Sequence, residues 1–120
     1  MEAEKKRDMD LIRKQLLALE VGRDPLKIED YSEDALLYHI YLLDNAGFVH
    51  AAIARGNKGQ IAAAHVMEIT WTGQEFLQSI KDDTIWNKAK EKVLKPSASW
   101  TFGVLVEWLK QEIKAKIGIP

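Results

Sequence analysis

Hydrophobic residues recur at helical spacing in the middle of the chain. After Ser32 an apolar residue falls at every third or fourth position, which predicts a helix with one buried stripe. The stripe consists of Leu36, Leu37, Ile40 and Leu43. Ser32 is a good N-cap residue, and Gly47 can adopt the positive φ angle that ends a helix. We therefore expect a helix over residues 32–46.

A β-hairpin should follow this helix. Apolar residues on both sides of the turn Gly56-Asn57-Lys58-Gly59 are typical of strands. These residues are Phe48, Val49 and Ile53 before the turn, and Ile61, Val66, Met67 and Ile69 after it. The strands also hold many alanines, so we expect a thin hairpin with a loosely specified register. A helix that leads into a two-stranded hairpin, or wing, is the second half of a winged helix.

The residues before Ser32 predict one helix and a short connection. This first helix should run from about Lys6 to Val21, and Gly22 and Pro25 should end it. Only ten residues separate the helix from Ser32, too few for an ordinary middle helix with its turns. The middle helix of a full helix-turn-helix is therefore short or missing. Residues 26–28 could form a short strand beside the wing.

The part after the wing predicts further helices. Thr72-Gly73-Gln74-Glu75 has the form of a capping box, so a helix should begin there. Asp82-Asp83 should mark a break, with Asp83 or Thr84 capping the next helix and Pro96 ending it. A last helix should be opened by Ser97 or Ser99 and run to about Lys116. It has more apolar surface than an ordinary surface helix, so it should pack on the winged-helix body, on a second copy or on a partner.

The expected fold class is therefore α+β and mostly helical. It is a winged-helix (winged helix-turn-helix-like) domain with a two-stranded wing and extra C-terminal helices. Residues 1–96 would form the winged-helix-like part and residues 97–120 the C-terminal amphipathic helix, within one domain overall. A chain of 120 residues is of the size expected for one domain.

Composition points to a reducing compartment. The chain has no cysteine, so it can form neither a disulfide framework nor a thiolate metal site. No apolar run approaches the roughly 20 residues that a membrane span needs. The first ten residues lack the apolar segment of a signal peptide. We expect a cytoplasmic protein without membrane association.

The charge distribution bears on the type of partner. The net charge is −1, but Pro25 to Gly47 carries one basic residue against five acidic ones. DNA readers gain most of their affinity by neutralising phosphates with Lys and Arg. An acidic helix in the recognition position opposes this docking.

Candidate catalytic groups are few. A tight turn would place His50 opposite His65, but two histidines without a third ligand make a poor zinc site, so an ordinary surface pair is the favoured interpretation. Asp82 and Asp83 fit helix caps better than an acid/base pair, because adjacent residues point in different directions on a helix. No phosphate loop, dinucleotide glycine motif or nucleophile elbow is present. We expect no enzyme activity, no cofactor, no metal and no small-molecule substrate.

Two sets of residues are candidates for binding. Aromatic and polar residues on exposed helix faces suit a protein interface, although Tyr38 or Tyr41 could instead cover the edge of the core. This first set is Tyr38, Tyr41, Asn45, Trp100 and Trp108. Basic and polar residues of the leader and the wing tip suit DNA, although the wing tip could be a solubilising turn. This second set is Lys5, Lys6, Arg7, Arg55, Asn57 and Lys58.

Three stretches of the chain resemble a known family. These are KRDMDLIRKQLLALE near the start, YHIYLLDNAGFV in the middle and ITWTGQEFLQSIKDDTIWNKAK after the wing. They are similar to the domain-of-unknown-function family numbered 2513, which includes small phage, prophage and bacterial proteins. The resemblance covers nearly the whole chain. It implies a winged-helix-like fold and a mobile-element context, but no reaction and no site residues.

Two functions of different class follow. The favoured hypothesis is a phage-type interaction module that presents the acidic, tyrosine-bearing helix and the apolar C-terminal helix to a host or phage protein. The alternative is a DNA-binding transcriptional regulator that dimerises through the C-terminal helix and docks on double-stranded DNA by the wing and the basic leader. The second hypothesis predicts affinity that falls steeply with salt.

Overall fold

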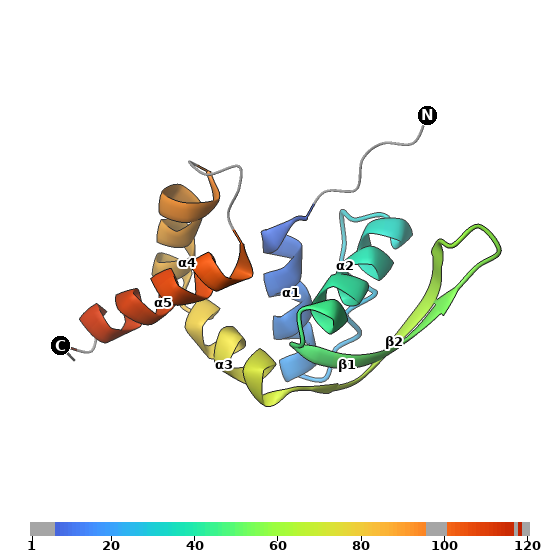
Figure 1. Ribbon diagram of the computed structural model, residues 1–120, viewed down its shortest axis with the longest axis horizontal. Coiled ribbons are helices and arrows are strands. Elements are labelled where there is room, and N and C mark those ends of the chain that lie inside the picture. The colour runs from blue at the N-terminus through green and yellow to red at the C-terminus, as the bar shows by residue number, and fades with distance from the viewer. Residues whose placement is uncertain (1–6, 96–100, 117, 119–120) are drawn as a thin grey trace. The chain divides into compact units, whose positions relative to one another are not determined.

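The computed structural model describes residues 7–95, 101–116 and 118. The fold is α+β and mostly helical, with one two-stranded antiparallel sheet (Figure 1). The elements in chain order are α1 (Met9–Glu20), α2 (Glu33–Asn45), β1 (Val49–Arg55), β2 (Ile61–Ile69), α3 (Trp71–Ile80), α4 (Asp83–Ala89), the π-helical turn η1 (Lys90–Leu94) and α5 (Phe102–Lys116). No helix in these ranges combines the length and the apolar character that crossing a membrane requires.

The chain divides into two compact units, residues 1–74 and 75–120. The first holds α1, α2 and the hairpin, and the second holds α4, η1 and α5. The boundary falls inside α3. The division expected at residue 96 remains a prediction.

Helix α1 begins where its sequence offers a cap. The Asp8 carboxylate accepts a hydrogen bond from the Leu11 backbone N–H at 3.1 Å, which satisfies one of the free donors of the first turn. Leu11, Ile12 and Leu16 are fully buried. The helix ends at Glu20, close to the predicted end.

The connection between α1 and α2 contains neither a helix nor a strand, so the prediction of a short or missing middle helix is confirmed. The predicted strand at residues 26–28 is wrong. Pro25 has no N–H to contribute, and the Asp24 carboxylate accepts from the Leu26 N–H at 2.9 Å. This local hydrogen bond makes a turn where a strand would need the backbone to be extended.

A buried glutamine joins this connection to both helices. The Gln15 side chain is fully buried on α1, and its Nε2 donates to the carbonyls of Pro25 at 3.1 Å and Leu36 at 3.0 Å. Its Oε1 has no partner among the described residues. Because an unpaired buried polar atom is costly, the two donated bonds must outweigh it in the native fold.

Helix α2 is capped by Ser32, as predicted. The Ser32 Oγ accepts from the Ala35 N–H at 3.1 Å, and Gly47 follows the helix with a φ of 81°. The helix packs against α1 and against both strands of the hairpin. Asp44, near its end, accepts from the Ala51 N–H at 3.0 Å and so ties the start of β1 to the helix.

Side chains along the hairpin alternate between an inner and an outer face. Its buried and half-buried pairs are Val49↔Ile69, Ala51↔Val66 and Ile53↔Ala64, and its exposed pairs are His50↔Glu68, Ala52↔His65 and Ala54↔Ala63. Two register shifts, between His50 and Ala51 and between Ala54 and Arg55, each insert one extra residue into β2. The predicted pairing of His50 with His65 is therefore wrong.

Two predicted caps are shifted along the chain. Helix α3 begins at Trp71, and the Gly73 N–H donates to the Thr70 Oγ1 at 2.9 Å, so Thr70 and not Thr72 is the cap. Helix α4 is capped by Asp82, which accepts from the Ile85 N–H at 3.0 Å, and not by Asp83 or Thr84. Asp82 has the extended backbone typical of an N-cap residue.

The second unit is built on α4, η1 and α5. Its buried residues are Phe76, Leu77, Ile80, Ile85, Trp86, Ala89, Val93, Leu105 and Leu109. The rings of Phe76 and Phe102 meet edge to face at 6.1 Å. Thr101 caps α5 by accepting from the Val104 N–H at 3.2 Å. The predicted end at Pro96 and caps at Ser97 and Ser99 lie outside the described residues.

Candidate functional site

Residues from both predicted binding sets meet on the first unit. The Arg55 guanidinium, from the end of β1, lies over the Tyr41 ring at 5.1 Å. The Tyr41 ring stacks on Tyr38 at 6.3 Å with an interplanar angle of 26°. We call this row of Arg55, Tyr41 and Tyr38 the tyrosine strip. It brings together Arg55, a candidate for DNA contact, and Tyr38 and Tyr41, two candidates for a protein interface.

Arg55 is held in place by the hairpin turn. Its Nη1 donates to the Gly59 carbonyl at 2.7 Å, and Gly59 has a φ of 80°, the left-handed conformation that a glycine adopts without strain. The side chain is exposed but has two contacts that restrict it. The strip is therefore largely organised before any partner arrives.

At its other end the strip adjoins a buried histidine. The His39 ring meets the Tyr38 ring edge to face at 5.5 Å and is 2% exposed. Its Nε2 accepts from the Asp8 N–H at 2.8 Å, and its Nδ1 lies 2.7 Å from the Ala35 carbonyl. Because the Asp8 N–H can only donate, the proton must be on Nδ1, so this ring is neutral.

The environment of His39 favours that neutral form. Burial lowers the pKa of His39 below its ordinary value of 6.5, while the Ala35 carbonyl and the Asp8 carboxylate act in the opposite direction. Protonation would place a second N–H against the Asp8 donor. His39 is therefore a structural link between α2 and the start of α1, with no nitrogen left for catalysis.

The middle of helix α2 has no fully exposed face. Tyr38 and Tyr41 are half-buried, so they cover the edge of the core and still offer part of their rings to solvent. Its exposed residues are Glu33 and Asp34 in the first turn and Asn45 at the end. A recognition helix that enters the major groove needs an exposed face over several turns. The acidic first turn of α2 would repel the phosphates of DNA.

The remaining predicted residues are dispersed. Asn57 and Lys58 are exposed in the hairpin turn, and Arg7 is exposed next to Asp8. Trp108 is half-buried on α5 in the second unit. Lys5, Lys6 and Trp100 lie outside the described residues.

The wing histidines do not form a metal site. The His50 Nε2 lies 3.6 Å from Glu68 Oε2 on the exposed outer face, and His65 opposes Ala52. Within the described ranges, no three His, Cys, Asp or Glu side chains come together as a metal would require.

Sequence reasoning missed two exposed apolar residues at the base of the hairpin. Trp71 is 83% exposed and Met67 is 62% exposed. The position of Trp71 in the helical repeat could have predicted that this residue is exposed. The buried residues of α3 are Gly73, Phe76, Leu77 and Ile80, and a residue two places before Gly73 is rotated by about 200° from it, to the far side of the helix.

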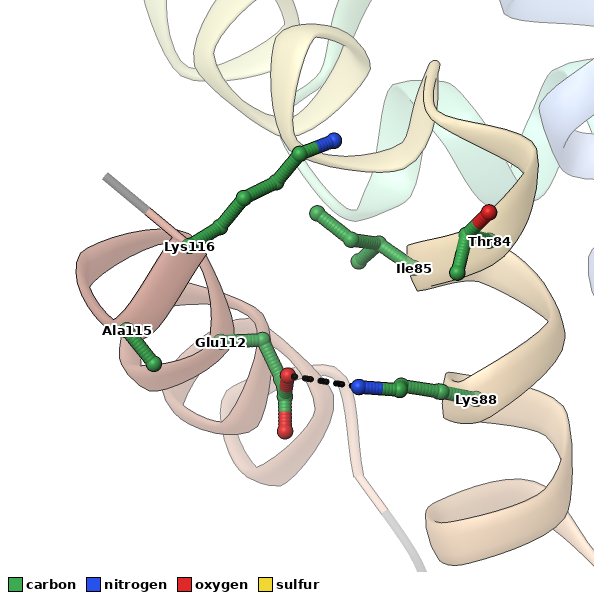
Figure 2. A pocket seen from close by; sticks show the side chains of 6 residues that line it. All are labelled: Thr84, Ile85, Lys88, Glu112, Ala115 and Lys116. Atoms are coloured by element: carbon green, nitrogen blue, oxygen red, sulfur yellow. Dashed lines mark ion pairs between the residues drawn. The ribbon is translucent and has the colours of Figure 1, made fainter. Parts of the chain in front are cut away.

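A hollow of about 400 Å³ lies between α4 and α5 in the second unit (Figure 2). It is lined by Thr84, Ile85, Lys88, Glu112, Ala115 and Lys116. Lys88 Nζ lies 3.7 Å from Glu112 Oε2 across it, and Lys116 hydrogen-bonds Asp82. The bond from Lys116, with that from the Ile85 N–H, holds the pKa of Asp82 below its usual range. These ion pairs link the two helices, so we assign the hollow a structural role.

The fold and the strip define a small α+β protein with a preorganised aromatic surface. The chain belongs to the family described as hypothetical protein (DUF2513), whose model matches residues 6–99. An uncharacterized protein from Haemophilus influenzae is 32% identical over 94 residues, which cover 73% of this chain and 78% of the relative. No solved structure matches. The tyrosine strip and Trp71 lie inside the family match, and α5 lies outside it.

Proposed function

We propose that this chain is a non-enzymatic interaction module that binds a host or phage protein. The observation that carries this proposal is the tyrosine strip. Tyrosine and arginine are enriched among the residues that dominate protein interfaces. The strip presents both types, partly exposed and already held by stacking and by the bond to Gly59, so little side-chain entropy is lost on binding.

The frame that presents this strip is proposed to be a winged-helix variant. Its support is the order of α1, α2 and the hairpin, with α2 in the recognition position. The hairpin packs on α2 through both strands and covers much of the surface that a DNA reader would expose. The frame would thus present a flat mixed surface and not a protruding helix.

A DNA-binding regulator is the second candidate. Asn57 and Lys58 favour it, since both are exposed at the tip of the hairpin where a wing contacts phosphates. Arg55 supports it less, because its guanidinium already contacts Tyr41 and Gly59. The acidic first turn of α2 opposes it further.

A titration of the pure chain against random-sequence duplex DNA, at low and at moderate salt, separates the two candidates. We expect no micromolar binding at either salt concentration. Binding that weakens steeply with salt, and that is lost in the Arg55→Ala, Lys58→Ala double variant, would overturn the proposal. The solution mass measured alongside tests dimerisation through α5.

The tyrosine strip is tested with a protein captured from the encoding organism, purified and titrated against variants. We expect Tyr41→Ala to weaken binding at least tenfold. Tyr31→Ala is the matched control, because Tyr31 is also half-buried and also lies under a cation, Lys14, at 5.2 Å, but outside the strip. Equal loss in both variants would show that the strip has no special role.

A further inference from the structure

Trp71 is exposed on a rigid support. The Thr70 N–H donates to the Phe48 carbonyl at 3.0 Å, and the Thr70 Oγ1 donates to the Gly47 carbonyl at 2.6 Å. These bonds and the cap to Gly73 place the start of α3 directly against the end of α2 and the start of β1. Trp71 lies between Thr70 and Gly73, and the hydrogen bonds of these two residues restrict its backbone conformation.

Gly73 shows how close this packing is. A Cβ added at Gly73 would lie 1.9 Å from the Phe48 carbonyl oxygen and 2.8 Å from the Ile69 side chain. Only a glycine fits there, so the first turn of α3 is fixed against the hairpin base. A bulky side chain on such a support binds with little loss of conformational entropy.

The exposed residues close to Trp71 along the chain are apolar and acidic. Met67 is also exposed, and Glu68 is 65% exposed in its side chain. No Lys or Arg occurs between Lys58 and Lys81, and the carboxylates of that stretch are Glu68 and Glu75. An anionic lipid surface would be repelled here, whereas a protein pocket with basic residues around it would be attracted.

We infer that Trp71 is an anchor that inserts its indole into an apolar pocket with a basic rim on the protein partner. The inference rests on the proposed function and names the chemistry of the partner. Met67 would widen the buried apolar contact, and Glu68 would pair with the rim. Trp is the residue type most enriched at the centres of protein interfaces.

The test uses the full chain with a photo-crosslinking residue in place of Trp71, and separately in place of Val21, which is 65% exposed and serves as the control site. A protein that crosslinks at position 71 and not at position 21 in extract of the encoding organism is purified. It is then titrated against wild type, Trp71→Ala, Val21→Ala and the charge-reversal variant Glu68→Lys.

We expect Trp71→Ala to weaken binding at least 30-fold, the charge reversal to weaken it three- to tenfold, and Val21→Ala to leave it within twofold. The melting temperature should stay unchanged in all variants, which separates lost contact from lost fold. Wild-type affinity that is unchanged in Trp71→Ala, or no crosslink at position 71 above the control, overturns the inference.

If the expected results are not obtained, two further measurements show whether this inference or the proposed function is wrong. The fluorescence emission of Trp71 is obtained as the difference between wild type and Trp71→Ala. Its wavelength should not shift when phosphatidylcholine or phosphatidylglycerol vesicles are added. A blue shift would assign the residue to a lipid surface. If the captured protein needs Tyr41 but not Trp71, the proposed function stands and this inference falls. A third variant carries the photo-crosslinking residue in place of Tyr41. If no protein crosslinks at position 41 or position 71, both fall.

Discussion

Trp71 in α3 and Trp86 in α4 are both tryptophans, yet Trp71 is 83% exposed and Trp86 is 2% exposed. The difference is one of helical phase. Trp86 lies beside Ile85 in the stripe that continues through Ala89 and Val93, whereas Trp71 lies opposite the stripe of α3. One indole therefore stabilises the fold, and the other is available for binding. In the proposed function, Trp71 binds the partner, whereas Trp86 stabilises the second unit.

The largest effect should come from removing the buried member of the pair. Trp86→Ala should lower the free energy of unfolding by about 3–5 kcal/mol, because it leaves a cavity in the second unit. Urea denaturation followed by circular dichroism measures this. Trp71→Ala is the matched control, and an equal loss in both variants would contradict the assignment of different roles.

The support of Trp71 can be broken without touching the indole. Gly73→Ala should cost about 1–3 kcal/mol, because the new methyl group collides with the Phe48 carbonyl. It should also weaken partner binding, since Trp71 would move. Gly103→Ala in α5 is the control, because its nearest neighbour would be Thr101 Oγ1 at 3.6 Å, and this change should be neutral or stabilise by about 0.5–1 kcal/mol. Thermal melts should therefore show a lower melting temperature for Gly73→Ala and no decrease for Gly103→Ala.

His39 should make the first unit sensitive to acid. Its folded pKa lies below the ordinary 6.5, so the unfolded chain binds the extra proton first as the pH falls. The stability that the neutral ring contributes is fully present above pH 6.5 and is lost as the pH falls through the folded pKa.

His39→Gln removes this titration, and we expect a flatter dependence of the urea midpoint on pH below 6.5 than in wild type. The variant should also cost about 1–3 kcal/mol at neutral pH if its amide fails to accept from the Asp8 N–H. Identical pH profiles for the two proteins would rule out the assigned role.

The smallest effect on stability should come from the exposed tryptophan. Trp71→Ala should change the free energy of unfolding by no more than about 0.5 kcal/mol, as for other surface substitutions. A loss above about 2 kcal/mol would show that the indole packs against the protein. Equilibrium unfolding at several protein concentrations would also reveal self-association through this residue.

Much of the local structure could be predicted because its causes are local. The stripe after Ser32, its cap and Gly47 define α2, and the turn at Gly56–Gly59 defines the hairpin. The ten residues between the predicted end of the first helix at Val21 and the cap Ser32 leave no room for an ordinary third helix. The predicted caps were wrong by one or two residues, because several neighbouring Ser, Thr and Asp side chains can each cap a helix and only the path of the preceding segment selects one.

The candidate site was predicted in its members but not in its arrangement. The sequence nominated Tyr38, Tyr41 and Arg55 for alternative functions, and the fold joined them in one strip. The pairing of the wing histidines failed because two bulges shift the register, and alanine-rich strands do little to oppose such shifts.

The sequence by itself determined the element order, the mostly helical α+β class and the acidic character of α2, because periodicity, turn residues and charge are properties of short segments. Tertiary structure alone decided that the hairpin and α1 cover α2, that His39 and Gln15 are buried as polar links, and that Trp71 stands free on a fixed turn. Each of these depends on contacts between residues far apart in the chain, such as Asp8 with His39 and Gly47 with Thr70. No local pattern encodes which distant partner a side chain will meet.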